Sequence, residues 1–211
     1  MLNTCGYERN WYPNVVMSTN QYLGKLLLLV SVPGGGKGTL LEYLKSKHPE
    51  FHYAVSCTSR PQRPGEIDGE NYHFLTPEEF QRRIETGEFL EWIQQDGGRY
   101  YGTLKSEISD QLAVGKVVVR EVEVRGVRSI RSLLPEDIVK VIFVTPGSWE
   151  EMRERILARA PIDEIELAHR QERYESEMKF APEADYIIEN KNGELEIAQA
   201  KLEKIIEDIT R

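Results

Sequence analysis

The 211-residue sequence predicts an α/β fold built on a parallel sheet, with a small mixed lobe inserted into it. The apolar run Leu26–Val30 passes through a glycine-rich turn into a helix-period segment that ends at Lys47, which is the pattern of a buried strand followed by a helix. Further strand and helix patterns alternate with short links to the end of the chain. Residues 57–103 interrupt this alternation with short strands and turns, so we expect them to form the inserted lobe.

Composition narrows the class of protein. A hydrophobic content of 40% and a charged content of 29% are typical of a globular chain with a substantial core. The net charge of −8 argues against a general nucleic-acid binder. Cys5 and Cys57 form neither a disulfide framework nor a metal-spaced pair, which favours a reducing compartment. No apolar run reaches the length of a membrane span and nothing resembles a secretory leader, so we expect a cytoplasmic protein without a membrane partner.

The elements follow in order from a polar, aperiodic segment. Residues 1–22 are expected to be a flexible extension outside the core, and Met17 is an alternative start. Core strands are predicted, from apolar runs between turn residues, at 26–30, 52–56, 117–119, 139–144 and 185–189. Helices are predicted, from helical periodicity, at 40–47, 105–114, 127–133, 149–157, 163–180 and 194–209.

Inside the lobe, strands are predicted at 72–75, 89–94 and 100–102, with a hairpin turn at Gly97 and Gly98. A helix over 77–84 is predicted to start at Thr76, because Glu79 three residues later completes a capping box. The predicted domain plan is a core of 23–56, 104–150 and 174–211, a lobe of 57–103 and a helical lid of about 151–173.

The glycine-rich turn has the character of a phosphate-binding loop. Successive backbone N–H groups and the helix N-terminus favour an anion, and Lys37 supplies a mobile cation for the outer phosphates. The strict pattern G-x-x-x-x-G-K-[ST] would have glycine in place of Ser31 and a hydroxyl in place of Gly38, with Thr39 one position late. A turn kept only for tight packing is therefore the alternative. The expected ATP-binding loop residues are Ser31, Val32, Pro33, Gly34, Gly35, Gly36, Lys37, Gly38 and Thr39.

Several short motifs accompany this loop in a fixed order. They are residues 56–66 (SCTSRPQRPGE), 68–72 (DGENY), 87–92 (GEFLEW), 100–103 (YYGT), 121–126 (EVEVRG) and 184–188 (ADYII). Each is weak alone, and the ordered set is specific. From about Gly24 to the C-terminus the chain resembles the guanylate kinases.

The resemblance implies a P-loop nucleoside monophosphate kinase fold, with a parallel-sheet core, an inserted small α+β GMP-binding lobe and a helical lid. It implies phosphoryl transfer from ATP with Mg²⁺ to GMP or dGMP, with the metal held by phosphates and water and by no direct protein ligand. It leaves a monomer or a homodimer open.

The family motifs assign an acceptor site. They place Arg60, Arg63, Tyr72 and Tyr101 on the phosphate of GMP, where arginine suits bidentate binding of a phosphate. They place Glu91, Ser56 and Thr103 on the polar edge of guanine, and Glu121 and Glu123 near the acceptor nucleoside, Glu123 standing where the family usually has aspartate. For Tyr72 and Tyr101 the alternative is packing in the core, and for Glu91 it is a position that faces solvent. For Glu121 and Glu123 the alternative is that one of them only pairs with Arg120 or Arg125.

The transferring group needs alignment and charge stabilisation rather than a covalent catalyst. The resemblance implies that Lys37, Arg60, Arg155, Arg159 and Arg170 are catalytic. Asn190 is expected on the adenine side of ATP. Residues 159–161 read Arg-Ala-Pro in place of the usual Arg-Gly-Thr, so the lid turn is expected to be stiffer. Arg153 and Arg173 are expected on a solvated helix face.

Two rival functions remain from the sequence. The first is a guanylate-kinase-like module that binds phosphorylated peptide without catalysis, although Lys37 and the base-reading residues argue against it. The second is a kinase for another phosphorylated small molecule, against which Ser56 and Glu91 argue.

Overall fold

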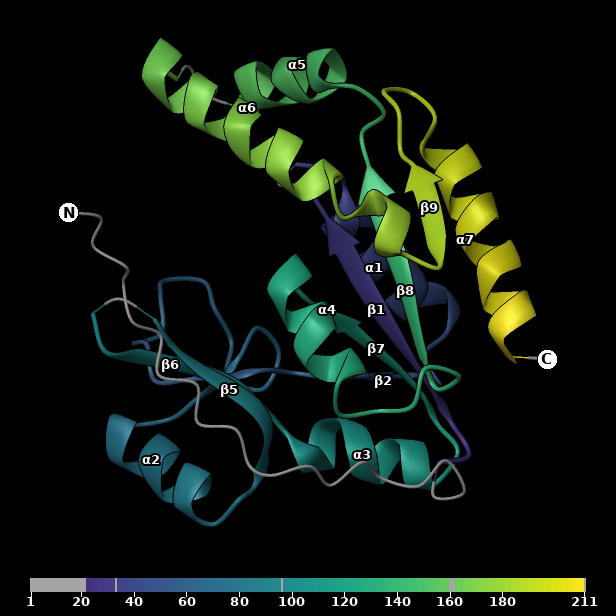
Figure 1. Cartoon of the computed structure of the whole chain (residues 1–211). Coiled ribbons are helices and arrows are strands. Elements are labelled where there is room, and N and C mark those ends of the chain that lie inside the picture. Colours follow the sequence, from purple (N-terminus) through teal and green to yellow (C-terminus); the bar gives the residue numbers. More distant parts are fainter. Residues whose placement is uncertain (1–21, 33, 96, 160–161, 211) are drawn as a thin grey trace.

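The main sheet has five strands, all parallel. The computed structural model describes residues 22–32, 34–95, 97–159 and 162–210. The strands of this sheet are β1 (Lys25–Ser31), β2 (His52–Tyr53), β7 (Val117–Glu121), β8 (Val139–Thr145) and β9 (Tyr186–Glu189). Their order across the sheet is β2-β7-β1-β8-β9, with β1 in the centre. The predicted α/β class with a parallel-sheet core is confirmed (Figure 1).

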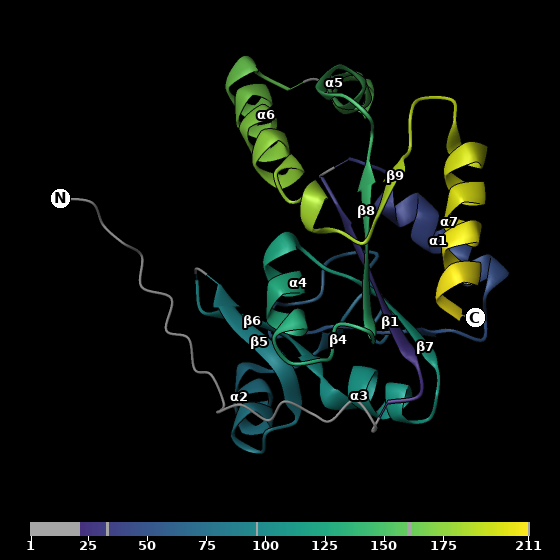
Figure 2. The same ribbon diagram turned by 45° about the vertical axis from the view of Figure 1, so that its right-hand side comes forward.

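Helices cover both faces of this sheet because β1 is apolar on both sides. Leu27 and Leu29 pack with α1 (Lys37–Lys47) and α7 (Leu195–Thr210). Leu26, Leu28 and Val30 belong to the core on the opposite face, to which α3 (Lys105–Ala113) and α4 (Val124–Arg131) contribute. Figures 1 and 2 show the two pairs of helices on opposite sides of the strands.

A second sheet lies beside this core. It has the order β4-β3-β6-β5 and is made of β3 (Cys57–Thr58), β4 (His73–Phe74), β5 (Phe89–Gln95) and β6 (Arg99–Leu104). Its own small core contains Phe80 of α2 (Pro77–Glu85), which stacks on Phe89 at 4.3 Å and on Tyr100 at 5.2 Å between ring centroids. The segment between β2 and α3 therefore has a separate hydrophobic centre, as expected of an inserted lobe.

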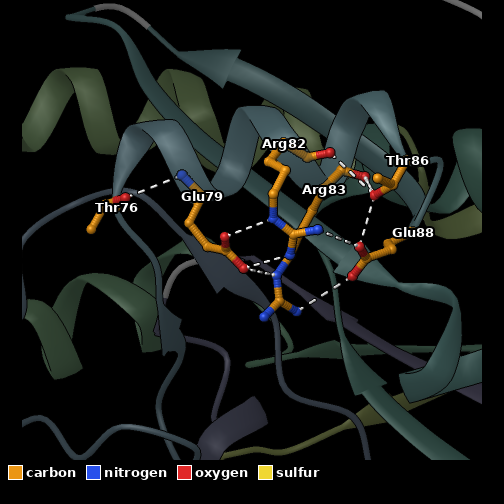
Figure 3. Close-up of polar contacts among 6 residues, drawn as sticks. All are labelled: Thr76, Glu79, Arg82, Arg83, Thr86 and Glu88. Atoms are coloured by element: carbon orange, nitrogen blue, oxygen red, sulfur yellow. Dashed lines mark hydrogen bonds and ion pairs between the residues drawn. The ribbon is translucent and has the colours of Figure 1, made fainter.

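The helix of this lobe starts at the predicted cap. Thr76 accepts a hydrogen bond at its side-chain oxygen from the Glu79 backbone N–H, 3.1 Å away. The Glu79 carboxylate in turn accepts from Arg82 and Arg83, and both arginines also pair with Glu88 (Figure 3). This network joins the first turn of α2 to the residue that precedes β5.

Two further helices, α5 (Trp149–Arg159) and α6 (Glu164–Met178), follow β8, and a short 3₁₀ turn (Ala181–Glu183) leads to β9. Trp149 and Tyr174 pack against each other with ring centroids 5.7 Å apart, which joins the two helices near the sheet. Both helices extend beyond the edge of the sheet at which the strands end (Figures 1 and 2). That edge is where open α/β sheets bind ligands.

The structure differs from the sequence predictions in several places, and one of them is β3, a lobe strand that the sequence did not predict. The second strand covers only His52–Tyr53, because the Val55 N–H donates to Glu107 (2.9 Å) and the chain leaves the sheet. Tyr22 is buried in the core, although the sequence placed it in the N-terminal extension. The helix expected at 127–133 is α4, which begins at Val124. The rest of that extension and Met17 lie outside the described residues. In the described part of the chain, no helix combines the length and apolar character needed to cross a bilayer.

Candidate active site

The glycine-rich turn joins the central strand to α1. Gly34 and Gly36 have positive φ angles of 84° and 93°, and Gly36 caps the helix that begins at Lys37. A Cβ atom on Gly35 would lie 2.9 Å from the Val144 oxygen, and one on Gly36 would lie 2.0 Å from the Asn190 amide nitrogen. Glycine at both positions lets the turn pack closely against β8 and Asn190, whereas a Cβ atom on Gly34 or Gly38 would meet only open space. This is the geometry of an anion-binding turn.

Ser31 takes the place of a usual glycine without distorting this turn. It is the last residue of β1, and every described residue with a positive φ angle is a glycine. A serine side chain is thus compatible with the strand conformation at this position. Val32 is buried and accepts a backbone hydrogen bond from Gly35 (3.0 Å), which closes the turn. Lys37 is half-buried, Gly38 and Thr39 are exposed, and Pro33 lies outside the described residues.

Two predicted residues from the second half of the chain contact this turn. Asn190, which follows β9, is buried and donates from its side-chain amide to the Gly35 oxygen (3.2 Å). Arg155 of α5 donates to the Gly34 oxygen (3.4 Å) and to the Asn190 oxygen, and its Nε donates to Asn192 (2.6 Å). The glycine-rich turn therefore meets both α5 and the segment after β9 at one place.

Arg60 and two tyrosines gather on the second sheet. Arg60 is 6% exposed and makes a two-pronged pair with Glu66, at 2.7 and 2.8 Å. Its guanidinium lies 5.3 Å from the centroid of the Tyr72 ring, and Tyr72 meets Tyr101 edge-on at 6.0 Å. Hydrogen bonds from Arg60 lower the pKa of Glu66 to about 2, and the same carboxylate raises the pKa of Arg60. Burial raises the pKa of Tyr72.

Arg63 follows on the same loop. Its backbone N–H donates to Glu66 (2.8 Å), while its side chain is exposed. Glu66 therefore fixes the loop and Arg60 together, and Arg63 extends from that fixed loop into solvent.

Glu91 and Thr103 are paired across β5 and β6. Thr103 donates from its hydroxyl to Glu91 Oε1 at 2.7 Å, and Arg120 of β7 donates to the same oxygen at 2.9 Å. The Glu91 side chain is only 16% exposed, so the alternative of a solvent-facing glutamate is wrong. From the sequence, Arg120 was considered only as an ion-pair partner of Glu121 or Glu123. The feature that could have indicated its contact with Glu91 is the presence of a charged residue within the apolar run of β7.

A cavity of about 350 Å³ lies between the two sheets and α1. Ser56, Tyr72 and Glu121 line it, together with Leu41 and Lys45 of α1. Glu121 ends β7 and is the register partner of Leu29 on β1, so the cavity opens beside the edge from which the glycine-rich turn leaves the sheet. Its volume falls in the range of small-molecule sites.

Of the predicted site residues that the structure describes, Ser56, Tyr72 and Glu121 line this cavity, whereas Arg60, Arg63, Glu91, Tyr101 and Thr103 do not. Glu123 and Arg170 contact other parts of the chain. Glu123 has a side chain that is 77% exposed and lies 3.8 Å from Arg173, not beside Arg120. Arg170 pairs with Glu166 (2.7 Å) one turn earlier on α6. The Arg159 side chain, like residues 160 and 161, lies outside the described set, so the predicted stiffness of the lid turn stays a prediction. Arg173 is 57% exposed, as expected of a solvated face.

Within the described ranges, no group of three or more His, Cys, Asp or Glu side chains is arranged to hold a metal.

A parallel sheet with this turn after its central strand, together with a lobe inserted after β2, has the architecture of phosphotransferases that bind nucleotides. The family model described as guanylate kinase matches residues 23–209. A guanylate kinase of Nostoc sp. is 42% identical over 175 residues, which is 83% of this chain and 86% of that protein. One of Bacteroides thetaiotaomicron is 39% identical and covers 92% of this chain and 94% of its own.

The structural comparison agrees. The crystal structure of guanylate kinase from Anaplasma phagocytophilum superposes with a TM-score of 0.63 at 25% identity, over 90% of this chain and 86% of that one. The chain belongs to the guanylate kinase family.

Proposed function

We propose that this protein transfers the γ-phosphoryl group of MgATP to GMP or dGMP, which yields ADP and GDP or dGDP. The observation that carries the proposal is the position of the cavity. Its wall residue Glu121 stands beside β1 in the sheet, so an acceptor in the cavity would lie next to the glycine-rich turn. Family membership supports the same reaction.

On the donor side, the ATP phosphates would lie on the N–H groups that precede and begin α1. The space beside Gly34 and Gly38 is open, while Gly35 and Gly36 pack against Val144 and Asn190, so the turn is fixed on the protein side and has room for a polyphosphate on the other. Lys37 would bridge the outer phosphates, and Asn190 would approach the adenine side. Mg²⁺, held by phosphates and water, supplies charge neutralisation when it is bound.

On the acceptor side, Arg60, Arg63, Tyr72 and Tyr101 would hold the phosphate of GMP. Aromatic rings and Glu66 fix the Arg60 guanidinium in the absence of ligand, so little side-chain entropy would be lost on binding. Ser56, Glu121 and Glu123 would contact the nucleoside.

Guanine would be selected by Glu91 and Thr103. Guanine presents an N1–H and a 2-amino group, both donors, where adenine presents an acceptor and a C–H. A buried carboxylate left without donors disfavours the wrong base by roughly 1–3 kcal/mol. Arg155, Arg159 and Arg170 would complete the charge around the transferring group as the lid helices close and exclude water.

We further propose a cytoplasmic enzyme, monomeric or homodimeric, whose partners are these nucleotides. The domain plan also stays a proposal, with the extension ending before the buried Tyr22: core 23–56, 104–150 and 174–211, lobe 57–103 and lid about 151–173.

The test is a coupled ADP-release assay of the full chain with MgATP and, in turn, GMP, dGMP, AMP, UMP and CMP. We expect turnover with the two guanine nucleotides alone. Absence of turnover with every acceptor would favour the binding module, and turnover with a non-guanine acceptor alone would favour a kinase of different specificity. EDTA in excess over Mg²⁺ is expected to abolish turnover.

A further inference from the structure

Arg120 is a charged residue in the interior of the main sheet. It is the fourth residue of β7, pairs in register with Leu28 of the central strand and is only 8% exposed. Val118 and Val119, just before it, are buried apolar residues. The position would suit an aliphatic side chain, so the guanidinium needs a separate explanation.

Stability does not supply that explanation. Arg120 has five N–H groups, and its Nη2 donates to Glu91 Oε1 at 2.9 Å. Its buried Nε and Nη1 meet no hydrogen-bond acceptor in the part of the chain that the structure describes. Buried donors without acceptors are unfavourable, and an apolar side chain in place of a buried ion pair is often neutral or stabilising.

The geometry at Glu91 gives Arg120 a role. The two donors, Thr103 from β6 and Arg120 from β7, converge on the same oxygen, Oε1. No described residue donates a hydrogen bond to Oε2. One carboxylate oxygen is thus fixed from two sides, and the other stays available to a ligand.

The two donors also come from different sheets. Thr103 lies beside Glu91 in the lobe sheet, whereas Arg120 reaches Glu91 from the main sheet. Thr103 alone would fix Glu91 relative to its own sheet. Arg120 additionally fixes it relative to the sheet that carries the glycine-rich turn.

We propose that Arg120 is a positioning residue for guanine recognition: it holds Glu91 Oε1 from the main sheet so that Oε2 faces the N1–H and 2-amino donors of the bound base. This inference rests on the proposed function, because it concerns the base that the proposed acceptor carries. Arg120 acts through Glu91 and does not touch the reacting atoms.

The experiment compares Arg120→Met, Arg120→Lys, Glu91→Gln and the double variant Arg120→Met/Glu91→Gln. Steady-state kinetics give KM for GMP, KM for ATP and kcat. We expect Arg120→Met to raise KM for GMP about ten-fold or more, while KM for ATP changes less than about two-fold, because only base contacts are disturbed. Arg120→Lys keeps the charge without the planar fork and is expected to give a smaller increase.

The double variant separates a positioning role from a structural one. If Arg120 acts only through the Glu91 carboxylate, adding Arg120→Met to Glu91→Gln changes KM for GMP by less than about two-fold. Effects that multiply in the double variant, or equal losses for GMP and ATP, would overturn the proposal. If Arg120→Met does not fold, Arg120→Lys and Glu91→Gln with their double variant provide the same cycle.

The matched control is Arg131→Met. Arg131 also pairs with a carboxylate, that of Asp185 at 2.8 Å, and has a buried Nε without an acceptor among the described residues. It belongs to α4 and contacts none of the proposed base-binding residues, so we expect KM for GMP to stay within about two-fold of the parent.

The outcome also separates this inference from the proposed function. An unchanged KM for GMP in Arg120→Met, beside a large increase in Glu91→Gln, would remove Arg120 and leave the proposed function intact. An unchanged KM in both single variants would show that the base-binding site itself is misassigned.

Discussion

Arg155 Nη1 of α5 donates to the backbone oxygen of Gly34 across 3.4 Å, although the two residues are 121 positions apart in the sequence. The same guanidinium also binds the Asn190 oxygen. The glycine-rich turn is thereby tied to a helix that extends beyond the edge at which the strands of the sheet end (Figure 2). A movement of α5 is therefore expected to shift the backbone of the turn.

We expect Arg155→Met to lower kcat at least ten-fold and to change KM for GMP less than about three-fold. Hydrogen bonds to charged groups contribute roughly 1.5–3 kcal/mol, and these lie on the donor side. Steady-state kinetics check this. Arg153→Met, an exposed arginine on the same helix, is the control. A larger effect on KM for GMP than on kcat would place Arg155 on the acceptor side instead.

Lys37→Ala tests the glycine-rich turn. Removing the cation that bridges the outer phosphates is expected to lower kcat by about a hundred-fold or more, or roughly 3 kcal/mol. Calorimetric titration is expected to show GMP binding within about three-fold of the parent protein. The control is Lys47→Ala, an exposed lysine in the last turn of the same helix. Unchanged turnover would exclude the turn from the reaction.

The Arg60–Glu66 pair predicts an acid-sensitive contribution to stability. The folded-state pKa of Glu66 is lowered from 4.5 to about 2, chiefly by its hydrogen bonds from Arg60. The ionised carboxylate therefore stabilises the fold above about pH 4.5, and this stabilisation declines as the pH falls toward about 2. We expect the difference in denaturation midpoint between the parent and Glu66→Gln to be constant from about pH 7 to pH 5 and to shrink below that.

Urea denaturation at a series of pH values measures that difference. Glu85→Gln, an exposed carboxylate at the end of α2, is the matched control. A difference that persists undiminished at about pH 3 would mean that ionised Glu66 does not stabilise the loop.

The burial of Cys57 predicts that its thiol is protected from alkylation. It is fully buried in the core of the second sheet, and burial raises its pKa to about 12. Since the thiolate is the reactive form, we expect iodoacetamide at about pH 8 to leave Cys57 unmodified in the native protein and to modify it completely after unfolding. Peptide mass spectrometry distinguishes it from Cys5. Equal modification in both states would show that the second sheet opens readily.

The main sheet was predictable because local sequence determines its strands. Leu26 to Val30 are apolar on both faces, and only a sheet covered by helices on both sides buries such a strand. The cap of α2 was predictable for a similar reason, since Thr76 and Glu79 interact within one turn.

The contacts of the site residues were less predictable because they depend on the packing of distant elements. The contact of Arg120 with Glu91 depends on the distance between the two sheets. The contact of Arg155 with the turn depends on the direction in which the chain leaves β8 to form α5. The shortness of β2 depends on Glu107, a residue of a helix far along the chain. None of these separations is encoded in local periodicity.

The central place of β1 has a consequence for synthesis on the ribosome. Its two neighbours are β7 and β8, and the Val144 oxygen closes against Gly35. A nascent chain that has released only the first helix and the inserted lobe thus lacks both flanking strands. The glycine-rich turn therefore gains its flanking strands only after Thr145 and its contact with Asn190 only after β9, so we do not expect a ligand of the turn to guide the folding of the first half of the chain.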